Sequence, residues 1–432
     1  MTPAARISAA IEVLTDIEAR RRPANDALKD WGLAHRFAGS GDRAAIAGLV
    51  YDALRRRASS THVMGEATPR ANMLGMLRLE RGLDVDAIAA LFSGARFAPQ
   101  PMSDAERERV AAASLAGAPP HIAGDYPEWL DGSFAAVFGE ARAEELAALA
   151  ERAPLDLRVN TLKAERDKIS AELAEYHPEQ TGWSPLGLRI VVAPGAKSPA
   201  IQSESDFIKG GIEIQDEGSQ LAALLSAAKP GEQVVDLCAG GGGKTLALAA
   251  MMENRGQIYA TDTDKRRLAP IHARLERAGV RNVQVRTPRG SADTLDDLKG
   301  AIDLVLIDAP CTGTGSWRRN PDAKWRLRPG ALEIRQKDQA TVLDRAVPLL
   351  KRGGRIAYIT CSVLDEENGE QIRGFLDRHP GFSVEKPDQV AAALGERGYL
   401  FAKAALISPE GLLMTPRRTG TDGFFVSVLR HA

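Results

Sequence analysis

The hydrophobic residues of the chain follow two different spacings, and the change between them marks the predicted domains. In the first part, apolar side chains recur three or four positions apart, as on the buried face of an amphipathic helix. Examples are Ile7, Ile11 and Leu14, followed by Ile46, Leu49, Val50 and Leu54. Further helices are expected at 73–81 and 84–92, before a proline-containing connector at 95–103. Residues 1–117 are therefore predicted to form an all-helical domain.

Strand-like runs enter the pattern from about residue 118. Residues 118–205 hold such runs at 157–161 and 188–193 and a helical run at 164–175, which predicts a small α+β domain. Residues 206–432 alternate short strands with longer amphipathic helices. The strands are expected at 233–237, 257–261, 283–286, 303–307, 355–359 and 424–429. Because this alternation is typical of parallel sheets covered by helices, the third domain is predicted to be a doubly wound, Rossmann-like α/β fold.

Composition narrows the class of protein. The chain is 44% hydrophobic and 26% charged, as expected of a soluble globular protein. No apolar run reaches the roughly 18 residues that span a bilayer. The first residues form an amphipathic pattern interrupted by acids, which does not resemble a secretory signal. We therefore expect a cytoplasmic protein without a membrane partner. The net charge of −1 means that any nucleic-acid binding depends on local basic patches.

Cysteine and histidine usage argues against disulfides and metals. The three cysteines, Cys238, Cys311 and Cys361, are too few and too irregularly spaced for a disulfide framework. None lies in CxxC spacing, and the seven histidines form neither HxH nor HExxH. The sequence therefore predicts that no metal is bound.

The strand at 233–237 runs directly into a glycine-rich loop and then a helix. The loop consists of Cys238, Ala239, Gly240, Gly241, Gly242, Gly243 and Lys244, and Thr245 follows. Glycines let the backbone approach a ligand closely, and a helix start offers N–H groups to it. Asp262, after the next strand, is placed to bind ribose hydroxyls, whereas Asp264 is expected to cap the next helix. Together these residues predict a cofactor site.

Two alternatives for this loop stay open. Gly243, Lys244 and Thr245 match the end of the nucleotide-binding GxxxxGK[ST] motif, although Cys238 stands where its first glycine belongs. The acidic strand Asp303–Asp308 would then be the second motif of an NTPase. The other alternative is a tight turn without a ligand. Four adjacent glycines speak against it, because they weaken a helix start without any gain in packing.

Two of the cysteines also follow predicted strands. Asp308, Ala309, Pro310 and Cys311 come after the strand at 303–307, and Thr360, Cys361 and Ser362 come after that at 355–359. Open α/β sheets bind ligands at the carboxyl ends of their strands. A single cysteine is usually a small buried hydrophobic residue. Two at this edge, both flanked by polar residues, instead indicate reactive thiols. Cys238 lies at the loop start, where we expect it to serve only as a spacer.

These residues resemble a known family, the RNA cytosine-5 methyltransferases typified by bacterial RsmB, also called Fmu. The similarity covers almost the whole chain, and the pairing of DAPC with TCS is its most specific part. Further matching segments are Leu157–Thr161 (LRVNT), Ile214–Gln220 (IQDEGSQ), Asn320–Trp325 (NPDAKW) and Thr421–Phe425 (TDGFF).

The resemblance implies an activity and a role for each site residue. The cofactor would be S-adenosyl-L-methionine, held by the glycine loop, Asp262 and Asp308. Cys361 would be the nucleophile, and Cys311 would assist product release as the base of the elimination step. The helical N-terminus, with Asp42, Arg43 and the run Leu54–Arg57, resembles a NusB-like RNA-binding domain. The expected substrate is 16S ribosomal RNA.

Cytosine chemistry explains why such an enzyme needs a thiol. Carbon 5 of cytosine is a poor nucleophile, but a thiolate adding to carbon 6 makes it reactive toward a methyl group. Asp308 is expected to hydrogen-bond the exocyclic amine and ring nitrogen of the base. Kept protonated in an apolar setting, it could also supply a proton. An RNA-binding factor that kept the fold and lost the activity is the remaining alternative.

The chain departs from the family pattern at two places. Gly241 replaces a proline of the glycine loop, which loosens the loop and leaves its N–H groups in place. After the third strand, Arg289 stands where an acidic residue normally holds the adenine amine, and Asp293 is a candidate substitute.

A basic segment follows Cys311. It holds Trp317, Arg318, Arg319, Lys324, Trp325, Arg326, Arg328, Arg335 and Lys337. Cations track phosphates and aromatic rings stack on unpaired bases, so this segment is predicted to contact a single-stranded or loop cytosine in RNA. A solvated helix with one or two buried tryptophans is the alternative. Nothing in the sequence requires more than a monomer.

Overall fold

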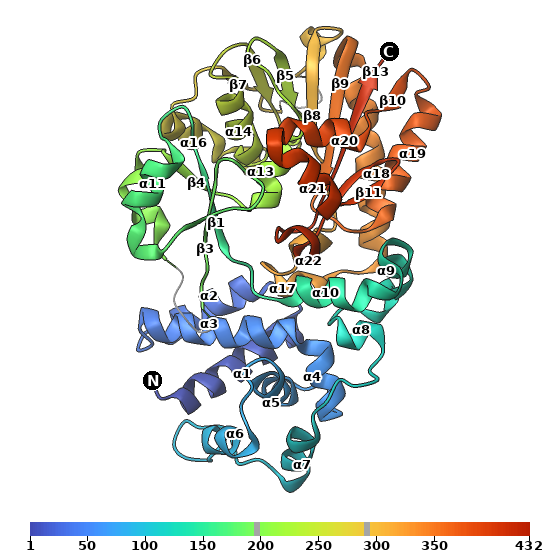
Figure 1. The fold of residues 1–432 in the computed structure, drawn as a ribbon. Helices are drawn as coiled ribbons and strands as arrows, with labels where there is room; N and C mark the ends of the chain where they lie inside the picture. The colour runs from blue at the N-terminus through green and yellow to red at the C-terminus, as the bar shows by residue number, and fades with distance from the viewer. Residues whose placement is uncertain (194–198, 289–293) are drawn as a thin grey trace. The chain divides into compact units, whose positions relative to one another are not determined.

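The computed structural model describes residues 1–193, 199–288 and 294–432, and the chain forms two compact units (Figure 1). The first unit consists of Met1–Ala153, the described part of Val192–Ser198, and Trp317–Leu327. The second consists of the described residues of Pro154–Val191, Pro199–Ser316 and Arg328–Ala432. Among the described residues, no helix has the length and hydropathy required to span a bilayer.

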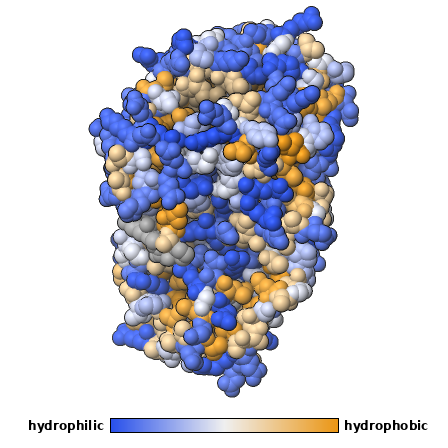
Figure 2. All heavy atoms as spheres, in the orientation of Figure 1, coloured by the Kyte–Doolittle hydropathy of each residue, from blue (hydrophilic) through white to orange (hydrophobic). Residues whose placement is uncertain are grey.

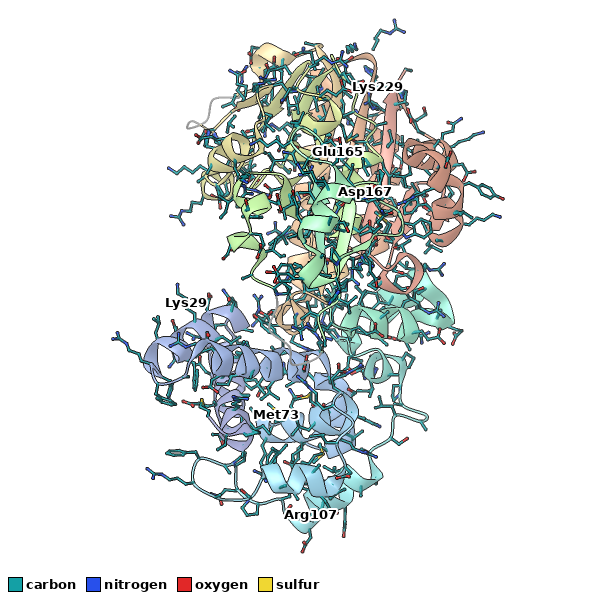
Figure 3. The ribbon with its side chains drawn as sticks, turned by 60° about the vertical axis from the view of Figure 1, so that its left-hand side comes forward. Lys29, Met73, Arg107, Glu165, Asp167 and Lys229 are labelled. Atoms are coloured by element: carbon teal, nitrogen blue, oxygen red, sulfur yellow. The ribbon has the colours of Figure 1, made fainter. Side chains whose placement is uncertain are left out.

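The first unit is helical, as predicted for residues 1–117, and it also includes α8 to α10 from the stretch predicted as α+β. Its α-helices are α1 (Pro3–Arg20), α2 (Ala24–Ala34), α3 (Ser40–Arg55), α4 (Arg57–Met64), α5 (Pro69–Leu79), α6 (Val85–Leu91), α7 (Asp104–Ala112), α8 (Pro120–Ala123), α9 (Asp131–Phe138), α10 (Arg142–Ala150) and α17 (Pro321–Arg326). Ile7, Leu14, Ile46 and Val50 are buried in one core, which confirms the predicted helix faces. Figure 3 shows Met73 within this unit, whereas the exposed Lys29 extends outward from it.

Helix α17 corrects the predicted RNA contacts of the basic segment. Trp317, Arg318 and Lys324 are buried, with 2%, 5% and 1% of their surfaces exposed. The Lys324 Nζ donates to the backbone oxygens of Arg55, at 3.0 Å, and Asp125, at 2.6 Å. Trp325 Nε1 donates to the Leu54 oxygen at 2.7 Å. Trp317 and Lys324 thus pack the segment into the helical unit and are not available for stacking or phosphate binding, and the half-buried Trp325 is held there through its Nε1 hydrogen bond.

The second unit contains a small antiparallel sheet. Its strands are β1 (Leu155–Val159), β2 (Glu179–Gln180), β3 (Gly187–Ile190) and β4 (Ile212–Ile214), in the order β2-β3-β1-β4. Helices α11 (Arg166–Glu172) and α12 (Ser205–Ile208) belong to the same region. Leu157, Leu188 and Ile212 form its buried core. The strands at 157–161 and 188–193 were thus predicted in the right places, and β2 and β4 were not predicted.

The large sheet of the second unit is the predicted doubly wound α/β fold. In the described residues its strands are β5 (Gln233–Asp236), β6 (Gln257–Ala260), β7 (Val283–Val285), β8 (Ile302–Asp308), β9 (Leu350–Thr360), β10 (Phe382–Val384), β11 (Leu406–Ser408), β12 (Gly411–Met414) and β13 (Phe424–His431). The order is β11-β12-β13-β9-β8-β5-β6-β7, and β10 pairs with β13. Strands β5 to β9 are parallel, whereas β13 runs antiparallel to β9.

Helices connect and cover these strands (Figure 1). They are α13 (Glu217–Leu224), α14 (Gly243–Met251), α15 (Lys265–Leu268), α16 (Ile271–Ala278), α18 (Pro329–Ala346), α19 (Gly369–Arg378), α20 (Pro387–Ala391), α21 (Gly398–Ala404) and α22 (Pro416–Thr419). In the view of Figure 2, hydrophilic side chains cover most of the surface and smaller hydrophobic areas lie between them.

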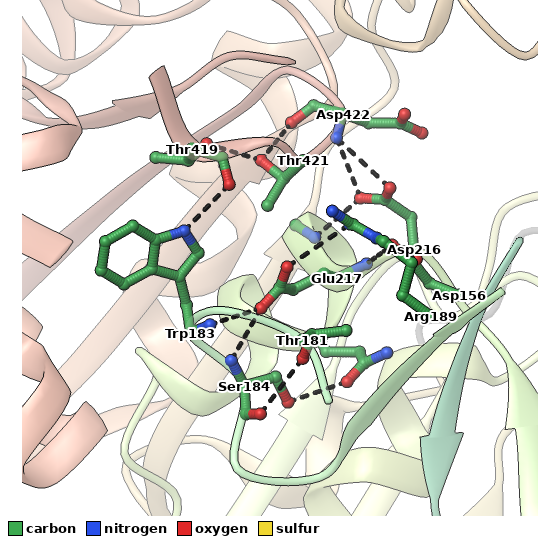
Figure 4. A network of polar contacts seen from close by, with 12 residues as sticks. Asp156, Thr181, Trp183, Ser184, Arg189, Asp216, Glu217, Thr419, Thr421 and Asp422 are labelled. Atoms are coloured by element: carbon green, nitrogen blue, oxygen red, sulfur yellow. Dashed lines mark hydrogen bonds and ion pairs between the residues drawn. The ribbon is translucent and has the colours of Figure 1, made fainter. Parts of the chain in front are cut away.

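A buried polar network links the small sheet to the large one within the second unit (Figure 4). Arg189 Nε and Nη2 donate to both carboxylate oxygens of Asp156, at 2.7 and 2.8 Å. Glu217 Oε1 accepts from the backbone nitrogens of Trp183 and Ser184, at 2.7 and 2.9 Å. Trp183 Nε1 donates to the Thr419 oxygen at 2.9 Å. Burial raises the pKa of Glu217. The network gives the IQDEGSQ and TDGFF segments a structural role.

Candidate active site

The glycine loop follows β5 and leads into α14. Gly240 and Gly242 have φ values of 50° and 83°, in the left-handed region that favours glycine. A Cβ at Gly242 would lie 2.5 Å from Ile271 Cγ1, so only glycine lets α16 pack against the loop. The N–H groups at the start of α14 can bind a carboxylate.

Asp262 is hydrogen-bonded to the backbone of the glycine loop. Its Oδ2 accepts a hydrogen bond from the Gly240 nitrogen at 3.0 Å, and its Oδ1 accepts from the Asp264 nitrogen at 2.9 Å. Asp264 caps α15 by accepting from the Arg266 nitrogen at 2.8 Å, as predicted. Carboxylates accept hydrogen bonds from ribose hydroxyls, and a helix start binds a carboxylate. This donor and acceptor set fits S-adenosylmethionine, which carries a ribose and an amino-acid carboxylate.

Asp236 lies fully buried beneath the loop, and Cys238 at the start of the loop is partly buried. Asp236 Oδ2 accepts from Thr245 Oγ1 at 2.7 Å, and burial raises the pKa of Asp236 to about 7. Burial, together with the nearby carboxylates of Asp236 and Asp308, also raises the pKa of Cys238. The Cys238 thiol is therefore protonated at neutral pH, which agrees with the expectation that it is only a spacer in the loop.

Lys244 connects the glycine loop to the loop after β8. Its Nζ lies 2.7 Å from Asp308 Oδ2 and 5.1 Å from the centre of the Phe424 ring. The lysine of a nucleotide-binding P-loop instead reaches toward phosphates, so this ion pair speaks against that alternative. Asp308 was expected in an apolar setting as a protonated acid. Its side chain is 36% exposed and paired with an ammonium group, so it is better suited to accept hydrogen bonds.

The two predicted reactive thiols lie side by side. Strands β8 and β9 are parallel neighbours with Asp308 opposite Ile359, which brings the residues that follow them to one edge. Cys311 Sγ and Cys361 Sγ are 3.3 Å apart. The hydrogen bond to Cys361, followed by burial, raises the pKa of Cys311 well above its usual value. The Cys311 thiol therefore keeps its proton at neutral pH, and either sulfur can be the donor in this contact.

Glu367 lies at the same edge and was not among the residues predicted from the sequence. It is fully buried and accepts from the Thr312 nitrogen at 2.8 Å, from Thr312 Oγ1 at 2.5 Å and from Gln339 Nε2 at 3.0 Å. Burial raises its pKa. It thus fixes the loop that carries Cys311. The available signal was its position shortly after Cys361 in a run of three acids, which would ordinarily indicate a solvated turn.

Two further predictions concerned adenine binding and the absence of a metal. Arg289 and Asp293, the residues considered for adenine binding, lie outside the described residues. Within the described part of the chain, no group of histidines, cysteines and acids could hold a metal ion.

Comparison with known proteins places the chain in a family. Residues 223–430 match the family of 16S rRNA methyltransferase RsmB/F, and residues 126–194 match the ferredoxin-like domain of RsmF/B-like methyltransferases. A relative from Synechocystis sp., named probable ribosomal RNA small subunit methyltransferase B, is 32% identical over 310 residues, or 71% of this chain and 67% of its own. The ribosomal RNA small subunit methyltransferase B of Sodalis glossinidius is 32% identical over 329 residues, or 76% and 68%.

A solved structure shares the fold of this chain. The crystal structure of the protein PH0851 superposes with a TM-score of 0.71 and 26% identity over 99% of both chains. The relatives, the doubly wound sheet and a loop that fits S-adenosylmethionine all agree. The chain therefore belongs to the RsmB/F family of S-adenosylmethionine-dependent RNA methyltransferases.

Proposed function

We propose that this enzyme methylates carbon 5 of a cytosine in 16S ribosomal RNA, through a covalent bond between Cys361 and carbon 6. The observation that carries the proposal is the pair of thiols, with sulfur atoms 3.3 Å apart at the carboxyl edge of the sheet. Methylation of an RNA oxygen or of an exocyclic amine needs no thiol nucleophile. A pair of thiols suits a reaction in which one adds to the base and the other assists its release.

The residues around the thiols divide the remaining tasks. The glycine loop and Asp262 would hold S-adenosylmethionine, which supplies an electrophilic methyl group when bound. Asp308 would accept a hydrogen bond from the exocyclic amine of the cytosine. The Lys244 ammonium beside it would stabilise the negative charge that develops on the ring.

The covalent steps follow from the positions of the thiols. The Cys361 thiolate forms a bond to carbon 6, and an electron pair moves into the ring, so that carbon 5 becomes nucleophilic. After methylation, the proton on carbon 5 passes to Cys311, which acts as a thiolate that has lost its own proton to solvent. The electrons of that C–H bond form the double bond between carbons 5 and 6 as the bond to Cys361 breaks. A thiolate whose pKa is raised is the stronger base for this step.

The target cytosine has to leave any base stack to reach these thiols, so we assign it to a single-stranded region or a loop. We further assign the helical domain of residues 1–117 a NusB-like, RNA-binding role. The residues at 118–205 would position the RNA for the catalytic domain at 206–432. This three-domain division and a monomeric, cytoplasmic enzyme stay predictions.

Trapping of covalent RNA on the enzyme tests the assigned roles. Wild type, Cys361→Ala and Cys311→Ala are incubated with small-subunit RNA and S-adenosylmethionine, and the products are separated on a denaturing gel. Cys311→Ala should accumulate a protein–RNA adduct, because addition proceeds and release is slow. Cys361→Ala should form none and transfer no methyl group. Binding of S-adenosylhomocysteine to each variant serves as the control for an intact fold.

The reversed pattern, with the adduct on Cys361→Ala, would make Cys311 the nucleophile. If the variants bind S-adenosylhomocysteine but even wild type transfers no methyl group to any RNA offered, the chain would be an RNA-binding factor on the same fold. Nuclease digestion of the methylated RNA, followed by nucleoside analysis, identifies 5-methylcytidine directly.

A further inference from the structure

We infer that Arg274 is a positioning residue for the cofactor loop, and that Glu213 of the small sheet holds it in place. Arg274 lies on α16, in the middle of the helix that packs against the glycine loop. Its Nη1 donates to the backbone oxygen of Gly241 at 2.6 Å. Its Nη2 donates to Glu213 Oε2 at 3.0 Å. One guanidinium group thus bridges the loop and strand β4.

The backbone at Gly241 has few other restraints among the described residues. Glycine has the greatest backbone freedom of all residues, and four of them follow one another here. Among the described residues, a Cβ built on Gly241 would come within 4 Å only of Arg274, whose Nη1 would lie 3.2 Å away. Gly242, by contrast, packs tightly on Ile271. The arginine therefore restrains the part of the loop that packing leaves free.

Glu213 is suited to anchor the guanidinium group. Its side chain is only 4% exposed, and it also forms an ion pair with Arg277, one helical turn along α16. It pairs across the small sheet with Arg158 of β1, which is 2% exposed. A charged hydrogen bond from a fixed guanidinium group is stronger than one between neutral groups. The buried carboxylate is thus surrounded by arginines, and only Arg274 extends to the loop.

The contact connects two parts of the second unit that the sequence analysis treated separately. Strand β4 belongs to the small sheet, whereas Gly241 belongs to the loop that would hold the methyl donor. A displacement of β4 would therefore move the restraint on the loop. The inference rests on the cofactor of the family and not on the identity of the methylated base.

Calorimetric titration with S-adenosylhomocysteine tests the inference. Arg274→Ala should weaken binding about tenfold, since a hydrogen bond from a charged group contributes roughly that factor. Arg274→Lys, which keeps the charge near Glu213 but cannot bridge both partners, should also bind more weakly than wild type. Arg277→Ala is the matched control, because it removes the other arginine on Glu213 without touching the loop. Its affinity should stay within about twofold of wild type.

A second variant measures the loop itself. Gly241→Ala added to Arg274→Ala should recover part of the affinity, since a Cβ restricts the free backbone and the guanidinium that it would have approached is removed. Equal affinities of Arg274→Ala and wild type would overturn the inference. So would an equal loss in Arg277→Ala, which would trace the effect to Glu213 and the small sheet alone. Failure of wild type to bind S-adenosylhomocysteine would contradict the proposed function instead.

Discussion

At the residue scale, the three cysteines of the site differ in their surroundings and therefore in their reactivity. Cys238 is partly buried at the start of the glycine loop, and burial and nearby carboxylates raise its pKa. Cys311 Sγ lies 3.3 Å from Cys361 Sγ, and its pKa is raised by that hydrogen bond and by burial. Thiolates react and thiols do not, so the same residue type has different reactivity at each position.

Alkylation should follow this order. At pH 7.5, iodoacetamide should modify Cys361 before Cys311 and Cys238, because the raised pKa values of those two leave less thiolate. Peptide mass spectrometry over time measures the three rates. In guanidinium chloride the rates should become similar, which controls for peptide detection. Faster labelling of Cys311 in the folded protein would contradict the proton assignment.

A second residue prediction concerns Asp236. Its folded pKa of about 7 lies above the usual carboxyl value, so the folded state binds a proton that the unfolded state releases. The stabilisation is present below pH 4 and is lost as pH rises toward 7. Asp236→Asn should therefore remove this dependence. The difference in unfolding free energy between wild type and variant should change by a few kcal/mol between pH 4.5 and 8. Urea titrations at several pH values measure it, and a difference that does not vary with pH would rule it out.

At the scale of elements, the sequence was most informative where apolar runs are long. Strands β5, β6, β8 and β9 were predicted because their buried residues form continuous runs. The glycine loop and both thiols could then be placed at one edge of the sheet, because they come directly after the ends of these strands. The short strands β10, β11 and β12 were missed, since three or four residues carry little periodicity. Glu367 and Arg274 were missed for another reason. Their roles depend on contacts with residues far away in the sequence, which local pattern does not contain.

The burial of Lys324 in helix α17 was also not predicted from the sequence, and its contribution to stability can be tested. The basic residues of this helix suggested RNA binding, yet Lys324 is buried, and burial lowers its pKa to about 7. Lys324→Ala would leave the Arg55 and Asp125 oxygens without their donor. It should lower the unfolding free energy of the helical unit by about 2–4 kcal/mol. Arg326→Ala, on the exposed side of the same helix, should change it by less than about 1 kcal/mol. Hydrogen exchange of α3 and α17 peptides monitors the loss, and similar effects of both variants would contradict it.

At the scale of the whole molecule, the order of the chain does not follow the order of the compact units. The chain enters the helical unit first and then builds most of the second unit. It returns to the helical unit briefly in the described part of Val192–Ser198 and again at Trp317–Leu327. Trp317 packs edge-on against Phe134 there, with ring centres 5.9 Å apart. The helical unit is therefore incomplete without a segment that lies between the two thiols in sequence.

Removal of residues 1–117 should expose that segment. The truncated protein should still bind S-adenosylhomocysteine, because the sheet, the glycine loop and Asp262 lie outside the deleted part. Trypsin should cleave it after Arg318, Arg319, Lys324 or Arg326, whereas the full chain should resist at Arg318 and Lys324, which are buried. Mass spectrometry of the first fragments identifies the sites. Early cleavage at Lys324 in the full chain would contradict the packing of α17.

The returning segment also limits how such an enzyme can evolve. A domain carried on one continuous stretch can be exchanged between genes by a single recombination event. Here, a new N-terminal domain would meet an α17 whose lysine and tryptophan fit the carbonyl groups of the old one. The two stretches must therefore change together, so the helical unit would be inherited with the second unit and would be difficult to replace alone.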